Sequence, residues 1–192
     1  MSKPEVKLLA EFSLPAMALG VVAALGAGVL ALVAGQPAGW AVTSGLALGV
    51  PIALLGAVYS SLVALKKVPT GVFTPAAAFW LVGFPLSMLV FEVVSQWQVT
   101  GTPGLPQEPL WQFLAYNALL SMGFAIGFLW SHEYLGRQWW PRIQDRNPYA
   151  ASTVAEHIEH AVAINERSAE AARARREKKA RKAQAQAVAK RS

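Results

Sequence analysis

The segment SHEYLGRQWWPR, residues 131–142, gathers side chains that could do chemistry. It places His132 beside Glu133, and an imidazole next to a carboxylate can exchange protons or bind a metal ion. Successive residues of a helix point about 100° apart, however, and the i, i+4 histidine pair of a zinc-protease helix is absent. The adjacent pair alone therefore predicts neither an acid–base site nor a metal site.

The same segment suits a membrane interface, because it follows an apolar run that ends near Trp130. Tryptophan and tyrosine are enriched at the headgroup layer, and an arginine stem can lie along lipid while its guanidinium reaches phosphate. We prefer this interpretation over a catalytic one. It predicts contacts with lipid headgroups or a protein partner for Arg137, Trp139, Trp140 and Arg142.

Glu92 is the one carboxylate within a long apolar run, where ionisable side chains are costly and often functional. If that run is centred near Pro85, seven residues place Glu92 about 10 Å from the membrane midplane, inside a half-thickness of about 15 Å. A small register shift would instead bring it to the outer interface. Its expected hydrogen-bond partners are Gln112, Tyr116 and Asn117. Such a group serves proton-coupled transport or adhesion between helices.

The motif EHIEH at residues 156–160 contains the other two histidines. Glu156 and His160 stand at i, i+4, and His157 and His160 at i, i+3, so each pair shares a helix face. Two or three ligands without a further carboxylate or cysteine cluster make a weak metal site. Helical charge pairing is the preferred interpretation.

Residues for other chemistry are missing from the sequence. There is no cysteine, and hence no disulfide, thiolate nucleophile or thiolate metal ligand. We also find no phosphate-binding glycine loop, no serine or aspartate triad motif, and no haem-ligating histidine within an apolar run. We therefore expect no enzymatic activity, no cofactor and no metal.

The apolar runs predict an all-α integral membrane protein with four transmembrane helices. Apolar residues make up 54% of the chain, and no charged residue occurs between Glu11 and Lys66. That interval is more than twice the roughly 20 residues that cross a bilayer, and Gln36-Pro-Ala-Gly-Trp40 divides it at a turn. The predicted spans are residues 12–35, 41–65, 74–96 and 110–131. They follow an N-terminal segment, 1–11, and precede an interfacial segment, 132–147, and a tail, 148–192.

Lysine and arginine near the span ends predict the orientation, since cytoplasmic loops retain positive residues. One side holds Lys3, Lys7, Lys66, Lys67, Arg137, Arg142 and Arg146, and the loops 36–40 and 97–109 hold none. Both termini are therefore expected in the cytoplasm. The first apolar run is too long for a signal-peptide core, so we expect it to stay attached.

Small residues at four-residue steps predict where the membrane helices pack, because close backbone approach drives their association. The predicted packing residues are Gly20, Ala24 and Gly28 in the first span, Gly45 and Gly49 in the second, and Gly123 and Gly127 in the fourth. The first two spans are joined by a short hairpin and should pack on each other. Pro51 and Pro85 lie inside spans, where each favours a kink.

The tail carries the charge of the molecule. Residues 132–192 hold thirteen Lys/Arg and seven Asp/Glu, a net charge of +6 that equals that of the whole chain. Asn147-Pro148 predicts a helix start, and the composition after it favours a basic cytoplasmic helix. A polybasic block suits an anionic leaflet or an acidic partner surface. It consists of Arg173, Arg175, Arg176, Lys178, Lys179, Arg181 and Lys182. No aromatic residue follows Tyr149 to stack on bases, so we do not expect nucleic-acid binding.

These observations favour a non-catalytic accessory or scaffold subunit of a larger complex in a bacterial plasma membrane. Its expected partners are anionic lipid headgroups and other membrane proteins, or further copies of itself. The alternative is a small proton-coupled transporter or an oligomeric pore, including a phage-type pore former, that uses Glu92. The spans offer few polar groups to line a water-filled route, which disfavours that alternative.

Overall fold

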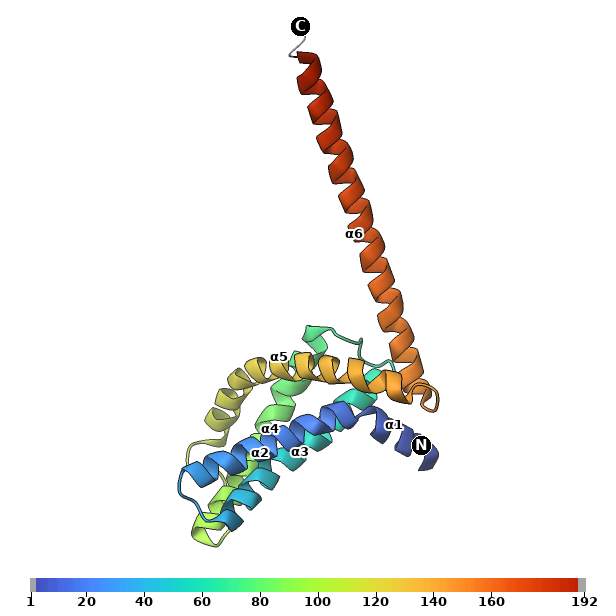
Figure 1. Ribbon diagram of the computed structural model, residues 1–192. Coiled ribbons are helices and arrows are strands. Elements are labelled where there is room, and N and C mark those ends of the chain that lie inside the picture. Colours follow the sequence, from blue (N-terminus) through green and yellow to red (C-terminus); the bar gives the residue numbers. More distant parts are fainter. Residues whose placement is uncertain (1–2, 190–192) are drawn as a thin grey trace. The chain divides into compact units, whose positions relative to one another are not determined.

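The computed structural model describes residues 3–189 of the 192-residue chain, with side chains through Arg175 and again at Lys178. Over this range every regular secondary-structure element is an α-helix, and loops join the helices (Figure 1). The helices are α1 (Lys3–Phe12), α2 (Leu14–Val33), α3 (Ala38–Ala64), α4 (Phe73–Thr100), α5 (Leu110–Ile143) and α6 (Pro148–Ala189). By contacts the chain forms two units, Met1–Ala151 and Ser152–Ser192.

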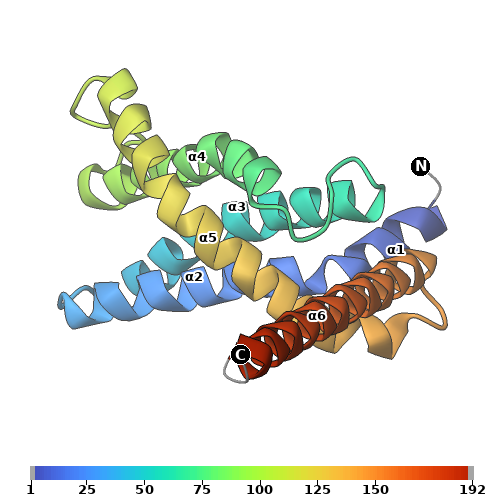
Figure 2. The same ribbon diagram turned by 90° about the horizontal axis from the view of Figure 1, so that it is seen from above.

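Four helices, α2 to α5, are long and apolar enough to cross a membrane. They indicate a multi-pass membrane protein, with the all-helical architecture and the four apolar helices that the sequence predicts. These four helices form a closed bundle, because α2 packs on α3, α3 on α4, α4 on α5 and α5 on α2. Figure 2 shows α5 running diagonally across the other helices of this bundle.

Short turns with left-handed residues end α2 and α3. Gly35 follows α2 with φ +79°, and Lys66 follows α3 with φ +57°. In each turn two N–H groups bond back to carbonyls of the last helical turn, at 2.9–3.0 Å. This pattern is a Schellman motif, which satisfies carbonyl groups at a helix end. The first of these turns closes the hairpin between α2 and α3.

Three helix limits differ from the predicted segments. The N-terminal segment forms α1, which contacts α2 and α3. Helix α4 continues past residue 96 to Thr100, where Gly101 caps it with φ +76°. Helix α5 continues past residue 131 to Ile143, although Pro141 lies within its last turn. The apolar runs of α4 and α5 end before the helices do. Composition determines where an apolar run ends, whereas capping determines where a helix ends.

The inner face of α5 is a single stripe that runs over the whole length of the helix. Its buried residues recur every three or four positions: Phe113, Asn117, Ser121, Ala125, Phe128, His132, Gly136, Trp140 and Ile143. This is the period of one face of an α-helix. The stripe continues without interruption from the apolar part of α5 into the part that the sequence assigned to the membrane interface.

Aromatic rings fill the interior of the bundle. Phe84 and Phe124 lie 4.8 Å apart between ring centroids, and Phe124 contacts Trp80 at 4.7 Å. Phe128 continues the series at 4.6 Å from Trp80 and 5.4 Å from Tyr59. These tilted and edge-on contacts are the arrangements that aromatic pairs prefer. The bundle interior is thus occupied by packed rings.

Candidate functional site

A buried polar cluster lies between α3 and α5, and it includes His132 from the segment that the sequence assigned to the membrane interface. His132 is fully buried, and its Nε2 lies 3.2 Å from Oγ of the buried Ser60. The imidazole Nδ1 lies 3.4 Å from Oε1 of Glu133. The ring of Tyr59 meets the imidazole edge-on, with centroids 5.8 Å apart. The hydroxyl of Tyr59 has no hydrogen-bond partner among the described residues.

Ser60, His132 and Glu133 lie next to one another in the way that the residues of a hydrolase triad do. In such a triad histidine activates a serine nucleophile and a carboxylate orients the histidine. The geometry gives this chemistry little support. Nδ1 makes no hydrogen bond within the described chain, and Ser60 is inaccessible to a substrate. Ser60 also lies inside α3, where backbone N–H groups bond within the helix and are not free to stabilise an oxyanion. The cluster does supply a specific polar contact between α3 and α5.

A second cluster connects α1 to the end of α5. It forms where Pro15 leaves a backbone carbonyl of α1 without its helical donor. Proline has no N–H, so Pro15 cannot give the helical hydrogen bond to the carbonyl of Glu11. Nε1 of Trp139 donates to that carbonyl instead, at 2.9 Å, and Nε1 of Trp140 donates to the carbonyl of Phe12 at 3.1 Å. Two indoles thereby satisfy carbonyl groups at the C-terminal end of α1.

Ring stacking completes the attachment of α1. The rings of Phe12 and Trp140 are nearly parallel, with centroids 4.9 Å apart. Trp140 also meets His132 at 5.5 Å, so the two clusters are joined. Gly136 makes room for the indole, because a Cβ at this position would lie 2.5 Å from the Trp140 ring.

Glu11, Arg146 and Asn147 form the polar edge of this attachment. Arg146 donates from Nε and Nη2 to Oε1 of Glu11, at 2.8 and 2.6 Å. The Asn147 amide donates to the carbonyl of Leu8 and to Oε2 of Glu11, at 2.8 and 3.1 Å. The hydrogen bonds from Arg146, and then from Asn147, hold the pKa of Glu11 below its ordinary value of 4.5. Because the Arg146 side chain is 64% exposed, solvent screens this ion pair.

Asn147 also begins the last helix. Its Oδ1 accepts hydrogen bonds from the backbone N–H groups of Tyr149 and Ala150, at 3.2 and 3.3 Å. This is N-cap geometry, and α6 begins at Pro148, where the pair Asn147-Pro148 predicted a helix start.

The structure does not pair Glu92 with Asn117. Glu92 is half-buried on α4, and its Oε1 accepts a 3.0 Å hydrogen bond from Nε2 of Gln96, one turn further along the same helix. Asn117 is buried, and its amide donates to the carbonyl of Phe113 within α5. Tyr116, another expected partner, is 63% exposed. Gln96 can donate to Glu92 because residues at i and i+4 lie on the same helix face, so no contact between helices is needed.

The four residues predicted at the membrane interface have different surroundings. Trp140 is fully buried, so it lies in the protein interior and not at a lipid-facing position. Trp139 is half-buried, while Arg137 and Arg142 are exposed. Nε of Arg137 donates to the carbonyl of Glu133, at 3.3 Å. A lipid or partner contact remains a prediction for the three accessible residues.

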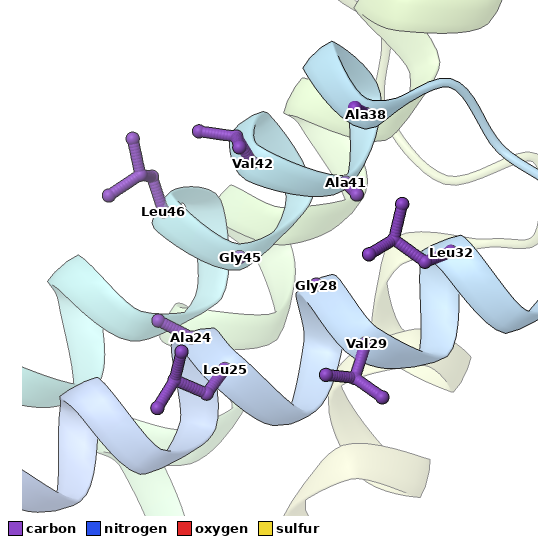
Figure 3. Close-up of a pocket in the computed structure, with 10 residues that line it drawn as sticks. All are labelled: Ala24, Leu25, Gly28, Val29, Leu32, Ala38, Ala41, Val42, Gly45 and Leu46. Atoms are coloured by element: carbon purple, nitrogen blue, oxygen red, sulfur yellow. The ribbon is translucent and has the colours of Figure 1, made fainter.

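The small residues of α2 and α3 face each other closely. A Cβ added at Gly20 would lie 2.5 Å from the carbonyl of Gly49, and one at Gly45 would lie 2.6 Å from the carbonyl of Ala24. Toward the hairpin the same seam opens into an apolar groove of about 350 Å³. Figure 3 shows Gly28 and Gly45 between the two helices, with the larger side chain of Leu46 pointing away.

Gly123 and Gly127 of α5 lie in a different environment. Both are exposed, and a Cβ added at either position would have open space around it. Within the described chain they are therefore not contact points between helices. The buried stripe of α5 passes through Ser121, Ala125 and Phe128 instead.

The polybasic block lies on α6. Arg173, Arg175 and Lys178 are exposed. The side chains of the other four predicted residues, Arg176, Lys179, Arg181 and Lys182, lie outside the described part of the chain. Among the residues that the structure describes, no three His, Cys, Asp or Glu side chains gather as metal ligands.

Sequence reasoning missed Tyr59, Ser60 and the contacts that join Glu11 to Arg146 and Asn147. A signal for His132 existed, since it follows Phe128 by four positions in the stripe that begins at Phe113. No local signal connects Trp139 or Trp140 with α1, because each hydrogen bond joins residues 128 positions apart.

No protein-family model matches the chain, and no curated protein or solved structure matches it.

Proposed function

We propose that this chain is a non-catalytic accessory or scaffold subunit of a larger complex in the bacterial plasma membrane. Both termini then lie in the cytoplasm, and α6 contacts a protein partner or anionic lipid. The observation that supports this most is the division of side chains in the bundle. Aromatic rings fill the interior, whereas large apolar side chains cover the outward faces.

The outward surface of α2 supports a role in helix association. Only 11% of its most apolar 18 residues are buried, and Leu30 and Val33 are 70% and 80% exposed. On α5, the open surface at Gly123 and Gly127 would let the backbone of another helix approach closely. Apolar faces of this kind suit contact with lipid or with helices of a partner.

The charge distribution supports a cytoplasmic role for α6. The chain from residue 132 onward carries the entire net charge of +6, and the described basic residues of the 173–182 block are exposed. A basic segment next to a membrane is attracted to anionic lipid or to an acidic protein surface. Contact with an acidic protein surface would bind that partner to α6, whereas contact with anionic lipid would hold α6 at the membrane surface.

Glu92 provides no specific support for the transport alternative. Its carboxylate is hydrogen-bonded to Gln96 within α4, an arrangement that requires neither a partner helix nor a substrate. Glu92→Gln is therefore expected to leave partner recovery unchanged. Loss of proton-coupled uptake in the same variant would favour the transporter instead.

The scaffold proposal is tested by altering the tail. One variant lacks residues 166–192, and a second keeps the full length but replaces the seven basic residues of 173–182 with glutamine. Partner recovery from the native host is measured by quantitative mass spectrometry after purification in mild detergent. We expect both variants to recover less partner than the wild type. Unchanged recovery with both would contradict a binding role for α6.

A further inference from the structure

A groove of about 250 Å³ lies between the beginning of α2 and the last turns of α5. One wall consists of Leu14, Pro15 and Ala18, and the other includes Leu135 and the Trp139 ring. Gln138 and Arg142, four residues apart on α5, add polar groups to the same groove and are exposed. The groove therefore combines an apolar wall with a cationic end.

The length of α2 gives the depth of this groove in the membrane. Its 20 residues span about 30 Å, which matches the hydrocarbon layer. Leu14 therefore marks one boundary of that layer, and the charged helix α1 lies immediately before it. The groove is lined by the first residues of α2, so it lies where acyl chains meet headgroups.

Arg142 is the available cation of this region. Arg146 is paired with Glu11, and Nε of Arg137 bonds to the carbonyl of Glu133. The Arg142 guanidinium makes no hydrogen bond or ion pair within the described chain, and it can form two parallel hydrogen bonds to phosphate. The indole N–H of Trp139 is already bonded to the carbonyl of Glu11, so its ring contributes an apolar surface.

We propose that this groove binds one anionic phospholipid. The headgroup phosphate lies against Arg142 and the Gln138 amide, and one acyl chain follows Leu14, Pro15, Ala18 and Leu135. A docked helix fits less well, because membrane helices meet at small residues and this groove is bordered by Arg142, Gln138 and Trp139. The site does not depend on the scaffold role, since it needs only the bundle and a bilayer.

The test is a lipid titration of the purified full-length protein in detergent, followed by native mass spectrometry. The probes are dioleoyl phosphatidylglycerol and, for comparison, zwitterionic dioleoyl phosphatidylcholine. We expect one phosphatidylglycerol to be retained at low concentration, ahead of phosphatidylcholine. Arg142→Gln should weaken that binding about fivefold, because a basic residue near a membrane surface contributes roughly 1 kcal/mol. Arg142→Lys should restore part of it.

Two further variants separate this site from other modes of binding. Arg137→Gln is the matched control, because it removes a charge from the same helix outside the groove and should leave binding unchanged. Ala18→Trp keeps every charge but fills the apolar wall, and it should also weaken binding. Equal losses in Arg137→Gln and Arg142→Gln would indicate diffuse attraction and overturn the site. Unchanged binding in Ala18→Trp, or equal retention of the two lipids, would overturn it as well.

Discussion

Pro15 links a local feature of the backbone to the tertiary structure. By withholding an N–H it leaves the carbonyl of Glu11 unsatisfied, and the indole of Trp139 supplies the missing donor. Trp140 does the same for Phe12 and also stacks on its ring. The attachment of α1 thus rests on polar groups that would be costly to leave unpaired near a membrane.

Trp140→Phe tests this hydrogen bond. The substitution keeps an aromatic ring against Phe12 but removes the donor to the Phe12 carbonyl. We expect a loss of about 1–3 kcal/mol in stability, the usual cost of leaving a buried acceptor unpaired, and a lower Tm. The matched control is Trp130→Phe, at a position that is 66% exposed. Equal Tm values for the two variants in the same detergent would contradict the role of Trp140.

Acid should weaken the contact between α1 and Arg146. Because the pKa of Glu11 is lowered in the folded protein, the unfolded chain binds more protons as the pH falls. The stabilisation is therefore fully present above the ordinary pKa of 4.5 and is lost as the pH falls through the lower, folded value.

Thermal unfolding from about pH 7 to about pH 3 checks this sign. The wild type should be more stable than Glu11→Gln near neutral pH, and its advantage should shrink below the ordinary pKa of the carboxyl. An advantage that grows with acidification would contradict the assigned hydrogen bonds.

At the scale of helices, the seam between α2 and α3 depends on residues without bulky side chains. Gly20 and Gly49 approach so closely that a Cβ at either would meet backbone atoms of the opposite helix. Backbone cannot move aside as a flexible side chain can. The two helices would have to separate to accept a methyl group at this seam.

Gly49→Ala tests the seam. We expect overpacking to lower the stability by about 1–3 kcal/mol, detected as a lower Tm. Gly26→Ala is the matched control in α2, because a Cβ there has open space and alanine favours a helix over glycine. An unchanged or higher Tm for Gly49→Ala would contradict close packing of α2 on α3.

The elements were more predictable than their interior contacts. Four helices follow from apolar runs long enough to cross a bilayer, and Gly35 ends the first of them at a turn. The burial of His132 on the inner face of α5 was missed, because the tryptophans, the tyrosine and the arginines of residues 131–142 made that segment resemble a membrane interface. Average composition cannot reveal which face is buried, whereas the phase of the stripe from Phe113 onward does.

Candidate sites were less predictable for a physical reason. The hydrogen bond from Gln96 to Glu92 joins neighbours on one helix and could have been expected from their spacing. The contact of Ser60 with His132 could not have been expected, because it depends on how α3 and α5 are rotated relative to each other. That rotation is determined by packing of the whole bundle.

At the scale of the molecule, the apolar helices and the net charge lie in different parts of the chain. The bundle residues through 131 carry four lysines and four glutamates and are neutral, while the chain beyond carries the net charge of +6. A neutral bundle with outward apolar faces and a basic tail fits a subunit that holds partners together at a membrane. This is the central claim of the scaffold proposal.

The most direct test is affinity purification of the tagged, full-length protein from its native host in mild detergent. Mass spectrometry then identifies the proteins that co-purify and gives their stoichiometry. The scaffold proposal predicts a stoichiometric complex with at least one other membrane protein. Recovery of this chain alone, as a monomer or a homo-oligomer, would contradict it and direct attention to transport through Glu92.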